Sequence, residues 1–450
     1  MRGMKKTLLS PGWVTDKFIL LMLAVFPLWT GFQGYANITF SKFLFFVAAT
    51  GVWMLLVVIG AAVSGERPAV RGGSWAVLAL AAAAFVSAAF SPYGADVLLG
   101  AGRYDGLVSL LLYCFIFLGV SAYGRHRPAY VWALAFSLTV CCAVSLLQLL
   151  GHDPLNLFPG DMDYFDHGIK YSAEFLGNIG NVDVFATLLT AAVPFLLGDY
   201  VCSGEKRDRW LLLPAAFGLF IAVESGVASA KAGLAAGFLL GALVLLQKKR
   251  LKRLGIAAIV VAATAALAMN VHFTQSGVVL GAAPAETGSQ SETADSGTLY
   301  ELNQILHGHL EDSYGSGRVG IWRQLLEVYP QRPVLGGGPG TVSDRVDIQY
   351  SRYVKETGKT LRTRVDNAHN EYLGYLMDEG ALGLGAYLTL LALTLIRWIK
   401  GRKRRSAALG CGLAGYWVQS FFGIGLCLVL PVIWLLWGLQ WSDNDEKRIV

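Results

Sequence analysis

The polar residues best suited to chemistry stand together in one short segment, Asp366-Asn367-Ala368-His369-Asn370, directly before an apolar stretch. Asp366 or Asn367 has the side chain of a helix N-cap, so the pattern predicts His369 in the first turn of the following helix. A helix N-terminus disfavours the imidazolium ion, and a general base must be a neutral imidazole. The alternative is a histidine that only hydrogen-bonds its own loop, and the local sequence alone favours that alternative.

Metal chemistry has one candidate segment, in which Asp161 and Asp163 are followed by Asp166 and His167. The spacing is not that of a calcium loop, because no glycine stands at the sixth position, so a solvated acidic loop is the better interpretation. None of the six cysteines forms a CxxC pair, which argues against zinc and disulfides. We therefore predict neither a metal nor a cofactor.

The elements that position these residues are predicted to be membrane helices. The chain has 450 residues, of which 54% are hydrophobic and only 15% are charged, too few to cover a soluble protein of this length. We predict an all-α integral membrane protein with about 12 transmembrane helices. The apolar blocks lie at about 17–36, 41–63, 74–90, 106–123, 129–150, 182–201, 210–224, 231–247, 254–271, 371–398, 406–422 and 424–440.

The basic residues predict the orientation of these helices. They gather in every second connection, as the positive-inside rule requires of cytoplasmic loops, so the net charge of +6 does not indicate nucleic-acid binding. Both termini are then cytoplasmic, and the basic N-terminus precedes an uncleaved first helix rather than a signal peptide. The expected inner clusters lie at 67–71, 125–127, 206–209, 248–253 and 400–405.

Four segments follow from this topology. We predict transmembrane helices 1–9 over 1–271, a large extracytoplasmic loop between helices 9 and 10 over 272–370, helices 10–12 over 371–440, and a cytoplasmic tail over 441–450. Within the loop, Ala282 to Thr298 has a flexible composition, and Gly320 to Tyr329 has apolar residues at helical spacing. The loop shows no sign of a soluble domain with its own core.

Several motifs, in order, resemble the O-antigen ligase family of bacterial membrane glycan ligases and polymerases. The signature of that family is a histidine and a small polar residue, followed after nine positions by Gly-x-x-Gly. This chain has a similar pattern in His369-Asn370 and, nine residues later, Gly380-Ala381-Leu382-Gly383. The other similar motifs are Gly102 to Leu107, Gly177-Asn178-Ile179-Gly180-Asn181, Gly317 to Trp322, and Pro333 with Gly336 to Gly340. The glycine run lacks the Lys-Ser/Thr of a nucleotide phosphate loop and is expected to form a turn.

The resemblance implies a reaction on the outer face of the cytoplasmic membrane. The donor would be a glycan on undecaprenyl diphosphate, and the acceptor a hydroxyl on a glycan, lipid or protein, with no cofactor. His369 would be the catalytic base, and Arg318 would meet the diphosphate charge. Lys231 stands where the family commonly has an arginine, and its alternative is an ion pair with Glu224. The remaining candidate substrate-binding residues are Arg103, Asn178, Asn181 and Asn370.

Each of these roles has a structural alternative. Arg318 has the alternative of a solvated loop residue, and Arg103 that of an ion pair with Asp105 or Asp96. At the level of function, a glycan polymerase and a protein O-oligosaccharyltransferase share the donor and differ in the acceptor. A polysaccharide transporter is a further alternative. The two halves of the sequence are not repeats of one another, and the centres of the predicted helices contain almost no ionisable residues, so both features argue against transport.

Overall fold

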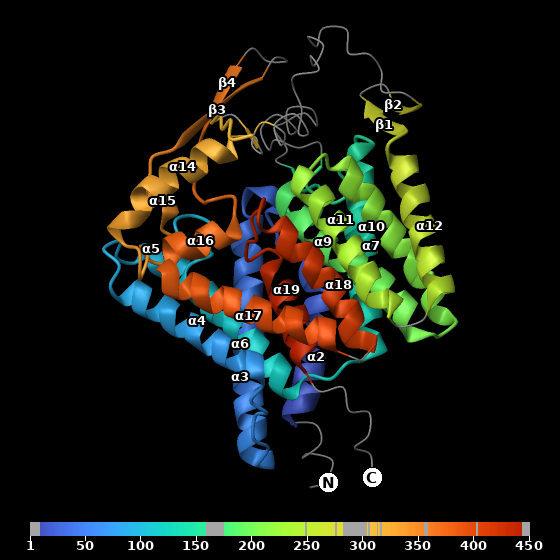
Figure 1. Ribbon diagram of the computed structural model, residues 1–450, viewed down its shortest axis with the longest axis horizontal. Helices are drawn as coiled ribbons and strands as arrows, with labels where there is room; N and C mark the ends of the chain where they lie inside the picture. Colours follow the sequence, from blue (N-terminus) through green and yellow to red (C-terminus); the bar gives the residue numbers. More distant parts are fainter. Residues whose placement is uncertain are drawn as a thin grey trace.

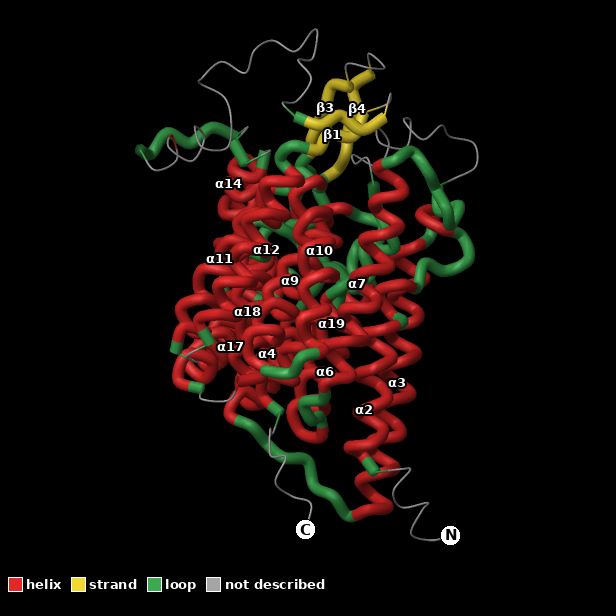
Figure 2. The backbone as a smooth tube through the Cα atoms, turned by 90° about the vertical axis from the view of Figure 1, so that its right-hand side faces the viewer, coloured by secondary structure: helices red, strands yellow, loops and turns green. Residues whose placement is uncertain are grey.

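The computed structural model describes residues 10–158, 175–247, 250–274, 277–281, 304, 307–312, 314–315, 317–354, 359–401 and 404–442. Over these residues the chain is a body of closely packed helices with two β-hairpins at one end (Figure 1). The described chain begins and ends at the opposite end of this body (Figure 2). Both ends therefore lie on one side, as the predicted topology requires, and which side faces the cytoplasm stays a prediction.

Each predicted apolar block contains a helix. The helices before the large loop are α2 (Pro11–Ala24), α3 (Ile38–Ser64), α4 (Gly72–Ala89), α5 (Asp96–Leu99), α6 (Leu107–Tyr123), α7 (Pro128–Leu149), α9 (Val182–Ser203), α10 (Leu212–Glu224), α11 (Ala228–Leu246) and α12 (Leu251–Ala268). The later helices are α14 (Arg318–Val328), α15 (Val342–Arg345), α16 (Glu371–Asp378), α17 (Gly380–Lys400), α18 (Arg404–Gln419) and α19 (Leu430–Trp441). Short 3₁₀ turns lie at Phe26–Leu28, Gly34–Ala36, Arg207–Leu211 and Tyr329–Gln331.

Eight of the described helices are long and apolar enough to cross a membrane. They are α3, α4, α7, α9, α11, α12, α17 and the segment Pro11–Leu28, which contains α2. The predicted spans at 106–123, 210–224, 406–422 and 424–440 correspond to α6, α10, α18 and α19, which have 17, 13, 16 and 12 residues. The chain is therefore a largely helical membrane protein, in which the predicted count of twelve spans stays a prediction.

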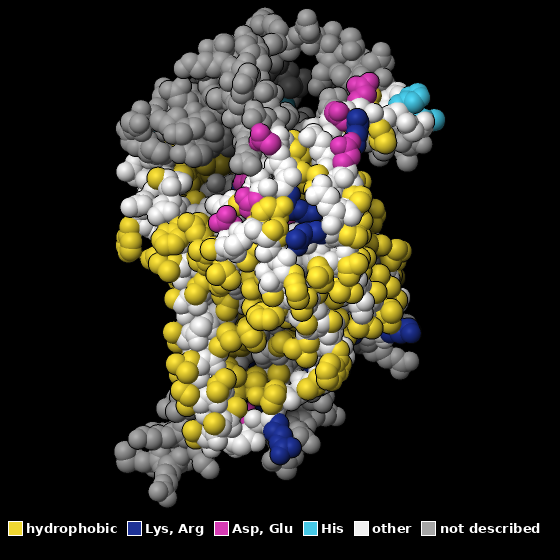
Figure 3. Space-filling view, turned by 90° about the vertical axis from the view of Figure 1, so that its left-hand side faces the viewer, with side chains coloured by type: hydrophobic (Ala, Val, Ile, Leu, Met, Phe, Trp, Pro, Cys, Tyr) yellow, Lys and Arg dark blue, Asp and Glu magenta, His cyan; other side chains and the backbone are white. Residues whose placement is uncertain are grey.

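Helix α9 lies at the centre of the body, because its apolar residues are buried on all sides. Helix α18 approaches it closely through glycine. A Cβ atom built on Gly412 or Gly415 would come within 2.3 or 2.4 Å of a backbone oxygen of α9. By contrast, the outer helices α3, α4, α11 and α12 carry exposed apolar side chains, and hydrophobic residues cover much of the face in Figure 3. Such a surface is typical of a protein in contact with lipid.

The predicted span 371–398 is interrupted, which corrects the expectation of one continuous helix. Helix α16 ends at Asp378, and α17 begins at Gly380. The break depends on Gly380, which has a φ of +69° and lies so close to Val334 that a Cβ atom would stand 2.3 Å from its carbonyl oxygen. A left-handed backbone at this position ends the first helix and starts the second in a new direction.

The large predicted loop contains strands and a small hydrophobic cluster. Strands β1 (Val271–Thr274) and β2 (Gly277–Leu280) pair antiparallel, as do β3 (Gln349–Val354) and β4 (Lys359–Arg364). The predicted helix at 320–329 is confirmed as α14. Its Ile321 and Leu325 pack with Leu373 and Met377 of α16 in a cluster apart from the main core. The loop therefore docks on α16 rather than forming a separate domain. The predicted flexible stretch 282–298 lies outside the described residues.

Candidate active site

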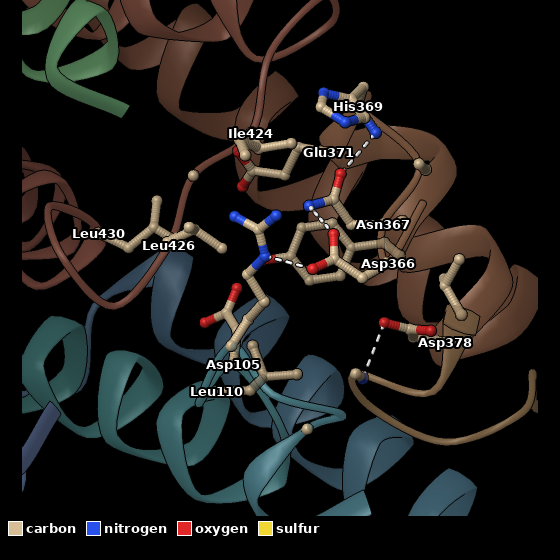
Figure 4. A pocket seen from close by; sticks show the side chains of 18 of the residues that line it. Asp105, Leu110, Asp366, Asn367, His369, Glu371, Asp378, Ile424, Leu426 and Leu430 are labelled. Atoms are coloured by element: carbon tan, nitrogen blue, oxygen red, sulfur yellow. Dashed lines mark hydrogen bonds and ion pairs between the residues drawn. The ribbon is translucent and has the colours of Figure 1, made fainter. Parts of the chain in front are cut away.

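A cavity of about 120 Å³ lies where the early and late polar motifs meet (Figure 4). Its walls come from residues 100–105, the segment 366–371, one face of α16 and the connection 423–426 between α18 and α19. One buried water needs roughly 10–15 Å³, so the cavity has room for a group such as a single sugar ring. The segments that form it are separated by hundreds of residues along the chain, and only the fold brings them together.

His369 lines this cavity, but not from the first turn of a helix. The predicted cap is wrong: Asn370 is the N-cap of α16, and its Oδ1 accepts a hydrogen bond from the Leu373 N–H at 3.0 Å. His369 precedes the helix with a φ of +46°, and its N–H donates to Asn367 Oδ1 at 2.9 Å. A non-glycine residue in this conformation is uncommon and is found often at functional sites. The Asn367 side chain thus fixes the backbone that presents the imidazole.

The surroundings of His369 favour its neutral form. The ring is half-buried, and burial, followed by the nearby charge of Arg318, lowers the pKa of His369 below its ordinary value. Among the described residues, no hydrogen bond to the imidazole is seen. The backbone next to it is held from outside the cavity, because Trp322 Nε1 donates to the Ala368 carbonyl at 2.9 Å. A neutral and unoccupied imidazole is what proton abstraction needs.

Arg318 is the first residue of α14 and lies near His369 without lining the cavity. Its Nη1 donates to the Gly315 carbonyl at 2.8 Å. Its Nε is buried and has no partner among the described residues. The side chain is thus only partly satisfied by the protein, unlike the fully solvated loop arginine of the alternative interpretation. Unsatisfied buried donors of this kind are rare and indicate a missing partner.

Arg103 does line the cavity, and it forms an ion pair with a partner other than the two considered as the structural alternative. Its Nε lies 2.5 Å from Asp366 Oδ2, in a segment 263 residues away. Asp105 instead accepts a hydrogen bond from the Tyr113 hydroxyl at 2.7 Å. The alternative of an ion pair with Asp105 or Asp96 thus named the wrong partner, because local spacing cannot reveal a contact between two distant loops.

The remaining predicted residues are placed differently. Asn370 lines the cavity. Asn181 caps α9, with its Oδ1 accepting from the Val184 N–H at 3.0 Å. Asn178 is buried, and its Oδ1 has no partner among the described residues. Lys231 is exposed in the first turn of α11 and does not line the cavity, and the described residues show no ion pair between it and Glu224.

Glu371 stands two residues after His369 but was not among the residues predicted from the sequence. Its carboxylate accepts hydrogen bonds from the Tyr416 hydroxyl at 2.6 Å and from the Tyr387 hydroxyl at 3.2 Å. Burial raises the pKa of Glu371 to about 7, partly opposed by the Tyr416 hydrogen bond. Burial likewise raises the pKa of Asp105 to about 6. The only sequence signal was a charged residue at the start of an apolar block, which is costly unless it has a role.

The glycine run Gly336 to Gly340 forms the predicted turn and ties the site together. The N–H groups of Gly337 and Gly338 donate to the carbonyls of Met377 and Asp378, each at 2.9 Å. The N–H of Gly340 donates to Asp378 Oδ2, also at 2.9 Å, and its carbonyl accepts from Ala101. This turn therefore links the end of α16 to the loop that carries Arg103.

Metal binding gains no support from the part of the chain that the structure describes. Within those residues, no group of three or more His, Cys, Asp or Glu side chains could hold a metal ion. The acidic segment Asp161 to His167, which the sequence analysis interpreted as a solvated loop, lies outside the described residues.

Comparison with known families agrees with the motifs. Residues 213–388 match the family model described as O-antigen ligase. The matched part runs from α10 to α17 and includes both Arg318 and His369. Among curated proteins no match was found. Residues 213–388 are therefore similar to the O-antigen ligase family, and they lie within a helical membrane body.

Proposed function

We propose that this protein transfers a glycan from undecaprenyl diphosphate to an acceptor hydroxyl, at the outer face of the cytoplasmic membrane. The match of residues 213–388 to the O-antigen ligase family supports glycan transfer in general. The observation that carries the specific proposal is the position of His369, which lines the cavity, lies near the Arg318 cation and has surroundings that favour the neutral imidazole.

The reaction is a single inverting displacement. A ring nitrogen of His369 takes the proton of the acceptor hydroxyl, whose oxygen forms a bond to the anomeric carbon of the donor. The bond from that carbon to the diphosphate oxygen breaks, and the electron pair leaves with the diphosphate. Arg318 meets the developing negative charge, since guanidinium binds phosphate oxygens with paired hydrogen bonds. No nucleotide is needed, because the sugar–phosphate bond of the donor supplies the driving force.

Lys231, Asn178 and Asn181 receive weaker support as substrate-binding residues. None of the three lines the cavity, and Asn181 has a sufficient role as a helix cap. Arg103 and Asn370 do line it. We therefore keep Arg103 and Asn370 as proposed binding residues next to His369, and propose Lys231 as a contact only for a donor that extends beyond the cavity.

The test is the chain length of lipid-linked glycan in cells that lack this protein, complemented with wild type or with His369→Ala. If the protein is a ligase, long polymers accumulate on the carrier lipid, and His369→Ala fails to clear them. Single repeat units on the carrier would instead identify a polymerase. Modified proteins lost together with the gene would identify a protein O-oligosaccharyltransferase.

A matched histidine variant controls for general damage. His309 is exposed, and its Nδ1 lies 2.7 Å from Gln304 Oε1, away from the cavity lining. We expect His309→Ala to restore transfer and His369→Ala to leave it at least about a hundredfold lower, as is typical for loss of a general base. Full transfer by His369→Ala would exclude the proposed mechanism. Ionophore-sensitive glycan flux in proteoliposomes would support a transporter instead.

A further inference from the structure

The cavity beside His369 is strongly acidic. Among the described residues, Arg103 is the one cationic side chain that lines it, and that side chain is already bound to a carboxylate. The carboxylates that line the cavity belong to Asp105, Asp366, Glu371, Asp378 and Glu379. A chamber with this balance of charge opposes the entry of an anion. It is therefore poorly suited to the diphosphate of the donor, although the catalytic histidine opens into it.

One carboxylate oxygen at this cavity lacks a donor. Asp378 lines the cavity, and its Oδ1 is buried without a hydrogen-bond partner among the described residues. Buried carboxylates need hydrogen-bond donors, and a ligand rich in hydroxyl groups supplies them. The cavity thus presents acceptors to a ligand that donates.

The cation proposed for the diphosphate lies outside the cavity lining but near His369. Arg318 has a buried Nε without a partner among the described residues, and it does not line the cavity. In an in-line displacement, the attacking hydroxyl and the leaving diphosphate lie on opposite sides of the anomeric carbon. His369 lines the acidic cavity and lies near the Arg318 guanidinium, which is compatible with that separation if the hydroxyl occupies the cavity.

We propose that this cavity is the acceptor subsite, and that it takes the sugar bearing the attacking hydroxyl in neutral form while excluding sugars that carry phosphate. The assignment of the bound sugar as the acceptor rests on the proposed function. The carboxylates of Glu371 and Asp378 would receive hydrogen bonds from the ring hydroxyls and so orient the acceptor toward His369. Asp366, bound to Arg103, would hold the two loops closed over it.

The experiment measures sugar binding without any donor, on the purified full chain in detergent, by saturation-transfer NMR. The probes are glucose, galactose and mannose, each compared with its own 6-phosphate. The measurement is made at pH 8, because burial raises the pKa of Asp105 to about 6 and that of Glu371 to about 7. We expect at least one neutral sugar to bind about tenfold or more tightly than its phosphate, which corresponds to about 1.4 kcal/mol.

Two variants test whether the cavity is responsible. Asp378→Asn and, separately, Glu371→Gln remove one negative charge each at pH 8, and each should reduce the preference for the neutral sugar severalfold. The matched control is Glu327→Gln, which removes a charge from the exposed surface of α14 and should leave the preference unchanged. Two cavity variants are used so that one misfolded protein does not decide the result.

The outcomes separate this inference from the proposed function. If none of the sugars binds, if the phosphates bind as well as the neutral sugars, or if neither cavity variant alters the preference, the acceptor subsite is wrong. If the preference is seen while His369→Ala still transfers glycan fully, the subsite stands and the catalytic proposal fails.

Discussion

The glycine turn beneath the site gives the sharpest structural prediction. Gly336 has a φ of +73°, and a Cβ atom there would stand 2.3 Å from the Asp378 carbonyl oxygen and 2.6 Å from the Gly380 nitrogen. Since real Cβ contacts essentially never fall below 3.0 Å, Gly336→Ala must move the Asp378 carbonyl by about 0.7 Å. Both clashing atoms belong to backbone, so no side-chain rotation relieves them.

The expected loss has two parts. A left-handed conformation costs an alanine roughly 1–2 kcal/mol, and displacing a packed backbone adds roughly 1–3 kcal/mol. For 450 residues, an unfolding entropy of about 2.1 cal/mol/K per residue converts 1 kcal/mol into a melting shift of roughly 1 °C. We therefore expect Gly336→Ala to melt about 2–5 °C below wild type. Because α16 carries cavity residues, transfer should fall about ten- to a hundredfold.

Gly385 provides the matched control. It lies in α17, and a Cβ atom built there meets nothing within 4 Å. Gly385→Ala should keep transfer activity and melt at or slightly above the wild-type temperature, since alanine has the higher helix propensity. The melting of purified protein in detergent, followed by light scattering or intrinsic fluorescence, measures both variants. If Gly336→Ala melts and transfers like Gly385→Ala, the described packing of the glycine turn on α16 is incorrect.

Three further predictions concern the polar groups of the site. Burial and the charge of Arg318 lower the pKa of His369, so the transfer rate should stay constant from pH 8 down through about 6.5, the ordinary pKa of histidine. Arg318→Gln should raise the pKa of His369 and move the acid limb of the pH–rate profile to higher pH. An unmoved limb would contradict this coupling. Burial raises the pKa of Glu371 to about 7, so between pH 4.5 and 7 the folded state holds a proton that the unfolded state has lost, and wild-type stability should fall as the pH rises through this range. Glu371→Gln should remove roughly 3 kcal/mol of that fall, measured as the melting temperature at pH 5 and pH 8. If the variant shows the same difference between the two pH values as wild type, Glu371 ionises normally. Trp322→Phe deletes the hydrogen bond to the Ala368 carbonyl, which should cost about 1 kcal/mol of stability and lower the transfer rate with little change in donor KM, and wild-type kinetics in this variant would show that the bond does not position the site.

The sequence was sufficient to predict the helical membrane character, because hydrophobic blocks of membrane length and periodicity are local features. Each predicted block contains a helix in the structure. It failed at Glu379–Gly380, where one expected span is two helices, since the break arises from contact with Val334, more than forty residues earlier. It also missed both hairpins, whose short strands lack a strong pattern amid the long loop.

The sequence also predicted the similarity to the O-antigen ligase family, because His369 and the motifs around it are contiguous or ordered along the chain. It misplaced the helix cap by three or four residues, since Asp366, Asn367 and Asn370 are all good caps and only tertiary contacts select among them. The choice falls on Asn370 because Asn367 is used to hold the left-handed backbone of His369.

Only the tertiary structure decided which charges share a chamber. Arg103 meets Asp366 across 263 residues, and Glu371 is held by tyrosines from α17 and α18. Such contacts depend on how helices pack, which no local pattern encodes. Composition and periodicity determined that the chain forms apolar helices with polar motifs at their ends, because those properties follow from each segment alone. The acidic cavity, and the position of Arg318 outside it, arise from the burial of distant segments against one another.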